Sequence, residues 1–491
     1  MPNPVPVMPK KKWIRYRKWI IVGLVLMLFL STILFHTNKK LPEGISYESD
    51  WYPAQNLEFL YNISYDNDGK REFEDQIYQA WYQAIEEAER FIVFDMFMFT
   101  TFHNQGQSFP ALSEQIVNRL ISQMERYPQL KVILITDEIN TTYGSHPSPE
   151  LERLKQAGAQ IVMSDLDKLR DSNPLYSGMW RMFFQWFGQK GPGWIKNPFS
   201  DMAPKVTVRS YLKLLNVKAN HRKVLITEKT GIIASANVHD ASAYHSNIAF
   251  RFSGDILREV WRAEQAVIRM SGGTELSIDE NEFSIEAKQS DTNDEAAVRV
   301  LTEGRIGQRV IEAIEQAEPT NRLWIGMFYL ADRSIVRALL EASERGTDVR
   351  LILDPNDNAF GQQKSGLPNK PVAAELKQRS GESIDIRWFN ADQDQYHTKL
   401  LLLEGEKNSV VIGGSANFTR RNVDDLNLET NLMVSAPTDS MFIEEVKSYF
   451  ERLWSNQDGE YTLPYETKAE KLPFLKQTVY TIQNILGFTT F

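Results

Sequence analysis

Two stretches, far apart along the chain, carry the same set of side chains, and that set can do acid–base and phosphate chemistry. In each, a histidine is followed two residues later by a lysine, five residues after that by a glutamate, and then by a Ser-Ala-Asn tripeptide. The first stretch holds His221, Lys223, Glu228, Ser235 and Asn237, and the second holds His397, Lys399, Glu404, Ser415 and Asn417. One His-x-Lys pair alone is a weak signal. Two copies with matching residues behind them predict a single site assembled from both.

Cleaving a phosphodiester without a metal needs a nucleophile, an acid for the leaving alkoxide and positive charge for the other phosphate oxygens. Imidazole can act as nucleophile or as acid near neutral pH, so two histidines supply the first two needs. Residues two apart in a strand point to the same side, so each histidine projects together with its lysine. The ammonium groups then face the phosphate oxygens, and neutral side chains add donors. These neutral donors are Ser235, Asn237, Ser415 and Asn417.

Other interpretations of these residues are weaker. A strand-end histidine beside a solvated lysine explains one copy but not the duplication. Neither stretch has His, Asp and Glu at metal-ligand spacing, and lysine is a poor neighbour for a bound dication, so we expect no metal and no cofactor. Two more histidines, His239 and His245, follow the first stretch, and we expect both to be structural polar residues. The chain has no cysteine, which excludes disulfides and thiolate chemistry.

A helix–strand order that occurs twice surrounds these stretches. The first half has predicted helices over 73–89, 112–127 and 151–157 and predicted strands over 90–97, 131–137 and 160–163. The second half has predicted helices over 306–317, 334–344 and 373–379 and predicted strands over 323–328, 349–354 and 384–389. This alternation predicts an α/β fold with a mostly parallel sheet covered on both faces. Within each stretch, paired apolar runs around polar turns predict a β-hairpin.

The fold class that follows is α/β, with two pseudo-symmetric αβα halves packed around one shared active site behind a single transmembrane helix. The expected limits are a basic N-terminus over 1–18, an anchor over 19–35, a first half over 45–270, an acidic linker over 271–296, a second half over 297–460 and an amphipathic tail over 461–491.

The anchor rests on an uncharged run from Trp19 to Phe35, at the short limit for crossing a bilayer. Six basic residues precede the run and only Lys39 and Lys40 follow it closely, which predicts a cytoplasmic N-terminus and a catalytic body on the extracytoplasmic side of the cell membrane. A cleaved signal peptide is the alternative, but no small-x-small cleavage site follows the run.

Residues 167–209 have no counterpart of similar length in the second half and are rich in aromatic side chains. One interpretation is that these side chains belong to the core. The other is that they rest on the bilayer interface, where tryptophan is favoured. The candidates for membrane contact are Trp180, Phe183, Phe184, Trp186 and Phe187.

The duplicated pattern resembles the phospholipase D superfamily over about residues 56–454, and the second copy, through Gly413-Gly414-Ser415-Ala416-Asn417, matches closely. Within the superfamily the chain is most similar to membrane-anchored cardiolipin synthase-like and phospholipase D-like bacterial proteins. The resemblance implies the phospholipase D fold and a covalent phosphohistidine intermediate. It implies that His221 is the nucleophile and that His397 is the acid that then activates the incoming water or alcohol.

The resemblance also implies supporting roles. Glu429 stands where the superfamily often has an acid that holds a catalytic imidazole, and we assign it to His397. In this alignment Asn247 matches Asn427, and Ala249 stands at the place of Glu429, which leaves the first histidine without an obvious carboxylate. Asn247 or Asp240 is the candidate replacement. The acids of the two motifs, Glu228 and Glu404, are expected away from the phosphate.

Three classes of function remain. A membrane phospholipid substrate, cleaved by water or transferred to an alcohol, fits the anchor, the aromatic segment and the net charge of −9. A membrane-anchored nuclease would use the same atoms, but an acidic chain disfavours an extended nucleic-acid surface. A non-catalytic scaffold is least favoured, since both His-x-Lys pairs are intact. No obligate protein partner is inferred.

Overall fold

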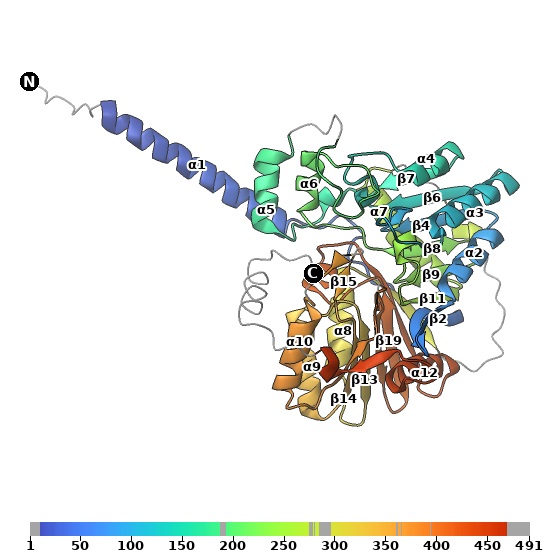
Figure 1. Ribbon diagram of the computed structural model, residues 1–491. Coiled ribbons are helices and arrows are strands. Elements are labelled where there is room, and N and C mark those ends of the chain that lie inside the picture. The colour runs from blue at the N-terminus through green and yellow to red at the C-terminus, as the bar shows by residue number, and fades with distance from the viewer. Residues whose placement is uncertain are drawn as a thin grey trace, which may run out of the picture.

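Two large sheets, one in each half of the chain, form the frame of the molecule (Figure 1). The computed structural model describes residues 10–186, 193–273, 278, 280–283, 296–359, 362–364, 366–392 and 394–468. The acidic linker predicted over 271–296 and the tail predicted over 461–491 lie mostly outside these residues.

The strands of the two sheets occur in matching order. The first sheet runs β3 (Lys70–Asp75), β2 (Gln55–Asn67), β11 (Asn247–Ser253), β9 (Gly231–Ala234), β8 (Lys223–Thr227), β4 (Phe91–Met96), β6 (Lys131–Thr136) and β7 (Gln160–Met163). The second runs β1 (Tyr52–Pro53), β12 (Ala297–Thr302), β20 (Thr430–Pro437), β19 (Asn408–Gly414), β18 (Lys399–Glu404), β13 (Arg322–Met327), β14 (Asp348–Leu353), β17 (Asp385–Phe389) and β21 (Thr462–Pro464). The strands from β2 to β7 in the first sheet correspond one to one with those from β12 to β17 in the second, and the edge strand β21 has no counterpart. The predicted pair of similar α/β halves is confirmed.

The prediction of mostly parallel sheets is wrong. Parallel pairing joins β4, β6 and β7 in the first sheet and β13, β14 and β17 in the second, and the other pairings within each sheet are antiparallel. The physical reason is that β8–β9 and β18–β19 are hairpins inserted beside the parallel strands. A hairpin reverses the chain direction, so the strands next to it pair antiparallel. The two predicted hairpins themselves are confirmed.

Helices cover the outer face of each sheet, and the two sheets share a central core. In Figure 1 the outer helices of the first half are α2 (Ile77–Glu87), α3 (Leu112–Arg126) and α4 (Pro149–Gln156), and those of the second are α8 (Gly304–Glu315), α9 (Arg333–Arg345) and α10 (Asn369–Arg379). Two further helices, α7 (Ile256–Met270) and α12 (Met441–Ser455), contribute apolar side chains to the central core.

The uninterrupted apolar strands follow from this layering. In β4, Phe91 and Val93 belong to the central core, whereas Ile92 and Phe94 belong to the outer core beneath the helices. Successive side chains of a strand point to opposite faces, so a strand buried on both faces is apolar along most of its length, and in β4 only Asp95 is an exception.

Local sequence fixes where several helices begin and end. The side chain of Asp332 accepts from the backbone N–H of Ser334 at 2.9 Å and of Ile335 at 3.0 Å, which caps α9. Gly346 ends the same helix with φ +98°, a backbone conformation that favours glycine. The remaining short elements are β5 (Phe99–Thr100), β10 (Val238–His239), β15 (Asn358–Ala359), β16 (Gln362–Gln363), α6 (Val208–Leu214), α11 (Arg420–Val423), α13 (Tyr465–Lys468) and 3₁₀ turns at 138–141, 166–168, 240–242 and 280–282.

Chain segments at both ends of the body cross the predicted limits. β1 lies in the range assigned to the first half, yet it pairs with β12 of the second half. The backbone N–H of Ser49 likewise donates to Val300 O at 3.1 Å. β21, in the range assigned to the tail, pairs with β17 at the edge of the second sheet. The strand β3 replaces the first residues of the helix predicted over 73–89.

The N-terminal helix α1 (Lys10–Asn38) projects away from the body (Figure 1). Its segment Tyr16–Asn38 is 23 residues long and apolar enough to cross a membrane. The helix α5 (Pro174–Met179) packs on this segment at Gly178, where a Cβ would lie 2.8 Å from Ile33 Cγ1 and 2.9 Å from Phe29 Cε2. A residue without a side chain therefore allows this close approach.

This contact can be tested by cross-linking, because the chain has no cysteine of its own. We expect the pair I33C and G178C to form a disulfide under mild oxidation, since the two positions are in contact and a disulfide needs Cβ atoms about 3.5–4.5 Å apart. Mass spectrometry after maleimide labelling measures the remaining thiols. The matched control is the double variant I33C and F183C, in which the second cysteine lies five residues beyond position 178. Equal labelling of both pairs would contradict the packing of α5 on α1.

Candidate active site

The two histidines lie close together because, next to each of them, a backbone segment of one half pairs with a segment of the other half. Residues preceding the first histidine pair with the segment before Glu429, since His221 N donates to Leu428 O at 2.9 Å and Leu428 N donates to Ala219 O at 3.0 Å. In the same way, Ser246 N of the first half donates to Gln395 O of the second at 2.9 Å. These two exchanges bring the ring centroids of His221 and His397 to 6.4 Å from one another.

Each imidazole is oriented by a side chain from the opposite half. His221 Nδ1 lies 3.0 Å from a carboxylate oxygen of Glu429, and His397 Nδ1 lies 3.0 Å from the amide oxygen of Asn247. Both partners accept hydrogen bonds, so each histidine carries its proton on Nδ1. The amide of Asn247 is itself fixed, because its Nδ2 donates to His245 O at 2.9 Å. The Nε2 atoms of both rings are thereby left for chemistry.

The structure corrects the expected partners of the two histidines. Glu429 holds His221 and not His397. Equal spacing from the Ser-Ala-Asn tripeptide would match Ala249 with Glu429. The loop between this tripeptide and the next strand is, however, two residues longer in the second half. In the sheets, Ala249 lies opposite Ala234, and Asn431 lies opposite Gly414. Asn247 is therefore the counterpart of Glu429.

Ser235 and Ser415 were expected to face the phosphate, and this is wrong. Both serines are fully buried behind the groups that orient the histidines. Ser235 Oγ donates to Asn247 Oδ1 at 2.9 Å and accepts from Ile248 N at 3.0 Å. Ser415 Oγ likewise donates to Glu429 and accepts from Thr430 N at 3.0 Å. The serines fix the orienting side chains and do not reach the site itself.

The two lysines have the same environment in both halves. Each Nζ donates to the carbonyl oxygen of the histidine two residues before it, at 2.6 Å in both cases. Each ammonium also lies over an aromatic ring, with Lys223 5.2 Å from the Phe97 centroid and Lys399 5.1 Å from that of Phe328. Each lysine is the first residue of its strand, β8 or β18, and its histidine lies just before that strand, so the projection of both side chains toward one phosphate stays a prediction.

Burial makes positive charge unfavourable in the empty site. It lowers the pKa of Lys223 to about 7 and that of Lys399 well below its usual range. Burial also lowers the pKa of His221 to about 4, against the opposing effect of Glu429, and lowers that of His397 well below the usual value, with Lys399 adding to the effect. Four basic groups that share one desolvated space favour an anionic ligand.

Asn237 and Asn417 occupy matching positions beside this space. Each follows its Ser-Ala and precedes a residue paired in parallel with the neighbouring loop, Val238 with Phe99 and Phe418 with Leu330. Their amide oxygens are buried and have no hydrogen-bond partner within the part of the chain that the structure describes. An amide oxygen accepts hydrogen bonds and a phosphodiester anion offers none, so the role of these residues as donors to the phosphate stays a prediction.

Two aspartates that the sequence analysis did not assign support the histidine segments. Asp137 accepts from Asn220 N at 2.7 Å, and Asp354 accepts from Tyr396 N at 2.7 Å, each directly before one of the two histidines. Burial raises the pKa of both aspartates to about 7. Each follows the central parallel strand of its half, β6 or β14, and this matched position was the signal that could have found them.

One buried ion pair breaks the symmetry of the two motifs. Arg222, between His221 and Lys223, lies 2.6 Å from Glu303. Glu303 also accepts from Glu429 N at 3.1 Å and from Ser46 N at 2.7 Å. The second motif has Thr398 in place of the arginine. Glu303 thus joins the first motif, the second half and the segment that follows the anchor.

The other predicted supporting residues lie away from the histidines. Glu228 accepts from Glu89 N at 2.8 Å, Glu404 accepts from Trp324 Nε1 at 2.7 Å, and Asn427 Oδ1 accepts from Ala219 N at 3.1 Å. The two glutamates stand at the far ends of β8 and β18, as expected from their distance to the phosphate. Their contacts are structural.

The aromatic segment divides into buried and exposed parts. Trp180 is only 2% exposed, so its assignment as a membrane contact is wrong. Phe183 and Trp186 are 46% and 75% exposed, and Phe184 is half-buried. Phe187 lies outside the described residues. The segment therefore has one side in the core and another open to its surroundings.

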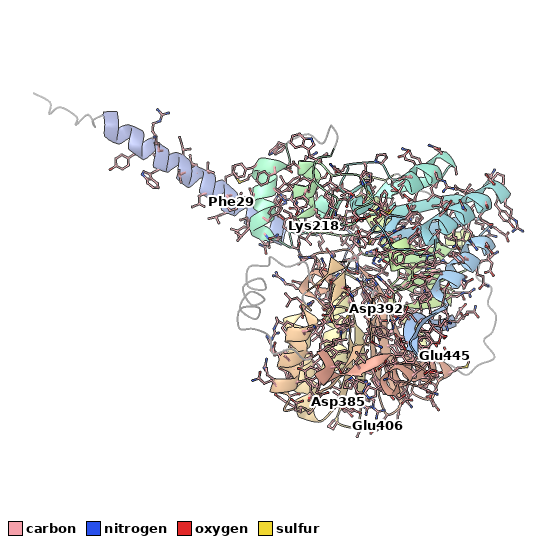
Figure 2. All side chains as sticks on the ribbon, viewed as in Figure 1. Phe29, Lys218, Asp385, Asp392, Glu406 and Glu445 are labelled. Atoms are coloured by element: carbon pink, nitrogen blue, oxygen red, sulfur yellow. The ribbon has the colours of Figure 1, made fainter. Side chains whose placement is uncertain are left out.

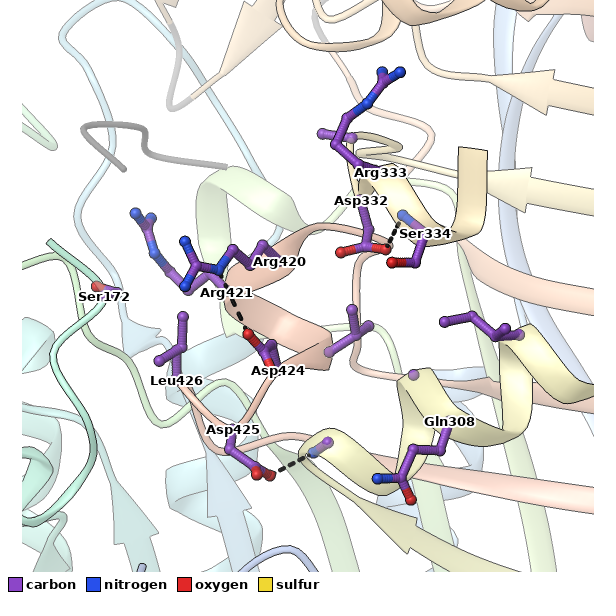
Figure 3. A pocket seen from close by; sticks show the side chains of 15 residues that line it. Ser172, Gln308, Asp332, Arg333, Ser334, Arg420, Arg421, Asp424, Asp425 and Leu426 are labelled. Atoms are coloured by element: carbon purple, nitrogen blue, oxygen red, sulfur yellow. Dashed lines mark hydrogen bonds and ion pairs between the residues drawn. The ribbon is translucent and has the colours of Figure 1, made fainter. Parts of the chain in front are cut away.

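A cavity of about 450 Å³ lies beyond the short helix α11 (Figure 3). Asn422 of this helix donates to Glu429, while Arg420 and Arg421 line the cavity. Its charges are partly paired, since Arg420 lies 3.4 Å from Asp424 and Asp425 accepts from Gly304 N at 2.8 Å. Neither His221 nor His397 lines this cavity, which is therefore separate from the histidine pair.

Comparison with known proteins agrees with this geometry. Residues 310–454 match the family described as Cardiolipin synthase, PLD-like domain. Phosphatidylserine synthase from Haemophilus influenzae Rd KW20 has a similar structure, with a TM-score of 0.56, 12% sequence identity and coverage of 93% of this chain and 97% of that one. Residues 310–454 thus match a phospholipase D-like domain, and the whole chain shares the fold of this synthase. The region matched to the family includes His397, Lys399 and Glu429.

Two further solved structures of lower similarity were found. Polyphosphate kinase from Porphyromonas gingivalis has a TM-score of 0.43 at 13% identity, over 88% of this chain and 53% of that one. Nuc, a phospholipase D family member from Salmonella typhimurium, has a TM-score of 0.25 at 20% identity, over 34% of this chain and 97% of that one. The search of curated proteins gives no match.

Within the described residues, no group of three or more His, Asp or Glu side chains is arranged to hold a metal ion. That the superfamily site in this chain works without a cofactor stays a prediction.

The electrostatics of the site predict proton uptake when an anion binds. At pH 8 Lys223, with its pKa of about 7, is mostly neutral in the empty protein, and a bound dianion favours the ammonium form. Sulfate is a suitable probe because it does not itself titrate near this pH. We expect calorimetric titrations in buffers of different ionisation enthalpy to report net proton uptake, reduced in K223M. Binding heats that do not depend on the buffer would contradict the shifted lysine.

Proposed function

We propose that the chain transfers the phosphatidyl part of a membrane phospholipid to water or to an alcohol through a phosphohistidine on His221. The observation that carries this proposal is the pair of imidazoles from opposite halves, 6.4 Å apart between ring centroids, beside two buried lysines. A phosphorus atom between the two Nε2 atoms would have a nucleophile on one side and a proton donor on the other.

The reaction has two balanced steps. The anionic phosphodiester, once bound, favours the His397 ring protonated on both nitrogens. In the first step, His221 Nε2 attacks phosphorus, the bond from phosphorus to the leaving oxygen breaks, and the protonated His397 gives its Nε2 proton to that oxygen. In the second, water or an alcohol gives its proton to His397, its oxygen bonds to phosphorus, and the phosphorus–nitrogen bond breaks. Lys223 and Lys399 stabilise the charge on the phosphate oxygens throughout.

The different partners of the histidines support the assignment of roles. Phosphorylation at Nε2 with a proton on Nδ1 leaves a positively charged ring, and the carboxylate of Glu429 stabilises that charge on His221. His397 has the neutral amide of Asn247 instead. A ring without a fixed counter-charge can alternate between its protonation states, as a general acid and base must.

The position of the anchor favours a lipid substrate. The backbone N–H of Asp171 donates to His36 O at 3.1 Å, and the Asp171 carboxylate lies 2.7 Å from the Lys218 ammonium. Lys218 precedes His221 by three residues, a reach of about 10 Å at most. Figure 2 labels Phe29 on the anchor and Lys218 within the body. This short route from anchor to nucleophile suits a substrate that resides in the bilayer.

An exposed apolar strip next to the anchor supports the same conclusion. Leu175, Met179, Phe183 and Trp186 recur at helical spacing and are 42–75% exposed. The helix α5 contacts Phe29 and Ile33, which lie about 7–14 Å before the C-terminal end of α1. This depth would place the strip in the interfacial layer of the bilayer. With the basic N-terminus in the cytoplasm, the body would lie on the extracytoplasmic side.

Trapping the intermediate tests the reaction and the roles together. We expect detergent-solubilised H397A, given a phosphatidyl ester of p-nitrophenol, to accumulate a covalent adduct on the peptide that contains His221. The good leaving group needs no acid, whereas the second step still needs His397 as base. With phosphatidylglycerol, turnover should fall about 10²- to 10⁴-fold in H221A and in H397A. Peptide mass spectrometry and product analysis measure both.

The controls separate the competing functions. Chelator should leave turnover unchanged. Release of nucleotides from single-stranded DNA, with no product from phospholipid, would instead support the nuclease. Full activity of both single variants would end the catalytic proposal, and an adduct on His397 in H221A would reverse the roles.

Membrane contact has its own test in the reconstituted full chain. We expect an environment-sensitive fluorophore on F183C or W186C to shift its emission to the blue in liposomes, because the label would enter the interfacial layer. The control is E406C, on an exposed turn of the second half. Identical spectra at the three positions would rule out insertion of the strip.

A further inference from the structure

A second cavity, of about 420 Å³, ends at a third histidine close to the catalytic pair. Its lining includes Ser64, Arg71, Gln107, Tyr244, His245 and Asp394. The ring of His245 lies 6.0 Å from that of His397, between centroids, so the wall of the cavity is in contact with the proposed acid.

His245 is a buried polar side chain without a protein partner. It is 9% exposed, and neither ring nitrogen makes a hydrogen bond to the described residues. His239 provides a contrast, because its two ring nitrogens lie 2.8 Å from Ser242 Oγ and 2.9 Å from Phe102 O. The expectation that both histidines are satisfied structural residues therefore holds for His239 alone.

The form and position of the His245 ring suit a hydroxyl group. Burial lowers the pKa of His245 to about 3, so the ring is neutral and offers one donor and one acceptor. Its backbone oxygen accepts from Asn247 Nδ2 at 2.9 Å, and the same amide holds His397. His245 and His397 are thus fixed to one another through a single side chain.

The charges of the cavity select among alcohols. Asp394 is paired with Arg71 at 2.6 Å, and the further carboxylates of Glu72 and Asp392 leave the lining net negative. Phe73 and Tyr244 form an aromatic pair at its edge, with centroids 5.4 Å apart. A negatively charged alcohol is disfavoured here, whereas neutral polyols and cationic amino alcohols are accommodated.

We propose that this cavity binds the alcohol that accepts or leaves the phosphatidyl group, that His245 holds its hydroxyl beside His397, and that the alcohol carries no negative charge. This inference rests on the proposed function. In the transfer step the bound hydroxyl gives its proton to His397 Nε2, its oxygen bonds to phosphorus, and the bond from phosphorus to His221 Nε2 breaks. His245 is a positioning residue in this step, since it acts on the alcohol and not on phosphorus.

The test measures, in the full-length protein, how much of the phosphohistidine intermediate reacts with water and how much reacts with an added alcohol. The substrate is the phosphatidyl ester of p-nitrophenol, with glycerol, ethanolamine or glycerol 3-phosphate added as acceptor. We expect transfer to glycerol and ethanolamine to exceed transfer to glycerol 3-phosphate. In H245A the ratio of transfer to hydrolysis should fall about tenfold or more, as for the loss of a buried hydrogen bond. The fall should appear mainly as a higher KM for the acceptor, and H245N should restore part of it.

The controls distinguish the two proposals. H146A removes an imidazole that does not line the cavity and should keep the wild-type ratio. A wild-type ratio in H245A, or equal losses of transfer and hydrolysis, would overturn the alcohol site while nitrophenolate release still supports the proposed function. No nitrophenolate release by the wild type would overturn both.

Discussion

The hydrogen bond between His221 and Glu429 joins residues that are 208 positions apart and that belong to opposite halves of the molecule. It exists only when the segment before the first histidine pairs with the segment before the acid. The same holds for His397 and Asn247, in the opposite direction. Neither half contains a complete site, so the docking of the two halves is itself the condition for the chemistry. Hydrogen bonds from Ser415 and Asn422 hold Glu429 in place for this purpose.

The docked interface also explains the unusual electrostatics. Two lysines and two histidines are brought together where little water remains, and burial lowers the pKa of all four. In the absence of a ligand the protein tolerates this by leaving the bases largely neutral near and above neutral pH. A bound anion stabilises the protonated forms of these lysines and histidines, and so offsets the effect of burial on their pKa. The site thus favours an anionic ligand, and the rings of Phe97 and Phe328 lie against the two lysines.

The anchor is connected to this centre through few bonds. His36 and Lys39 contact the segment at 165–171, where Lys39 Nζ donates to Asp167 O at 2.5 Å. Asp171 then pairs with Lys218, and Glu303 links Ser46 to both Arg222 and Glu429. The apolar N-terminal helix and the histidine pair are thus connected through one continuous structure. This arrangement agrees with a substrate that approaches from the bilayer and with an alcohol that enters through the cavity at His245.

The sequence by itself determined the two His-x-Lys motifs, the hairpins that carry them, the repeated helix–strand order and the apolar anchor. Each of these is a local property, because spacing and periodicity fix which side chains share a face. Only the tertiary structure decided which acid holds which histidine. Because one loop is two residues longer in the second half, spacing alone matches the wrong residues of the two halves. The pairing of segments between the halves also leaves no pattern in the local sequence. Tertiary packing likewise decided that Trp180 is buried while Trp186 is exposed, and that His239 is satisfied while His245 is not. Burial and partners depend on which elements pack together, and residues distant in the sequence supply them.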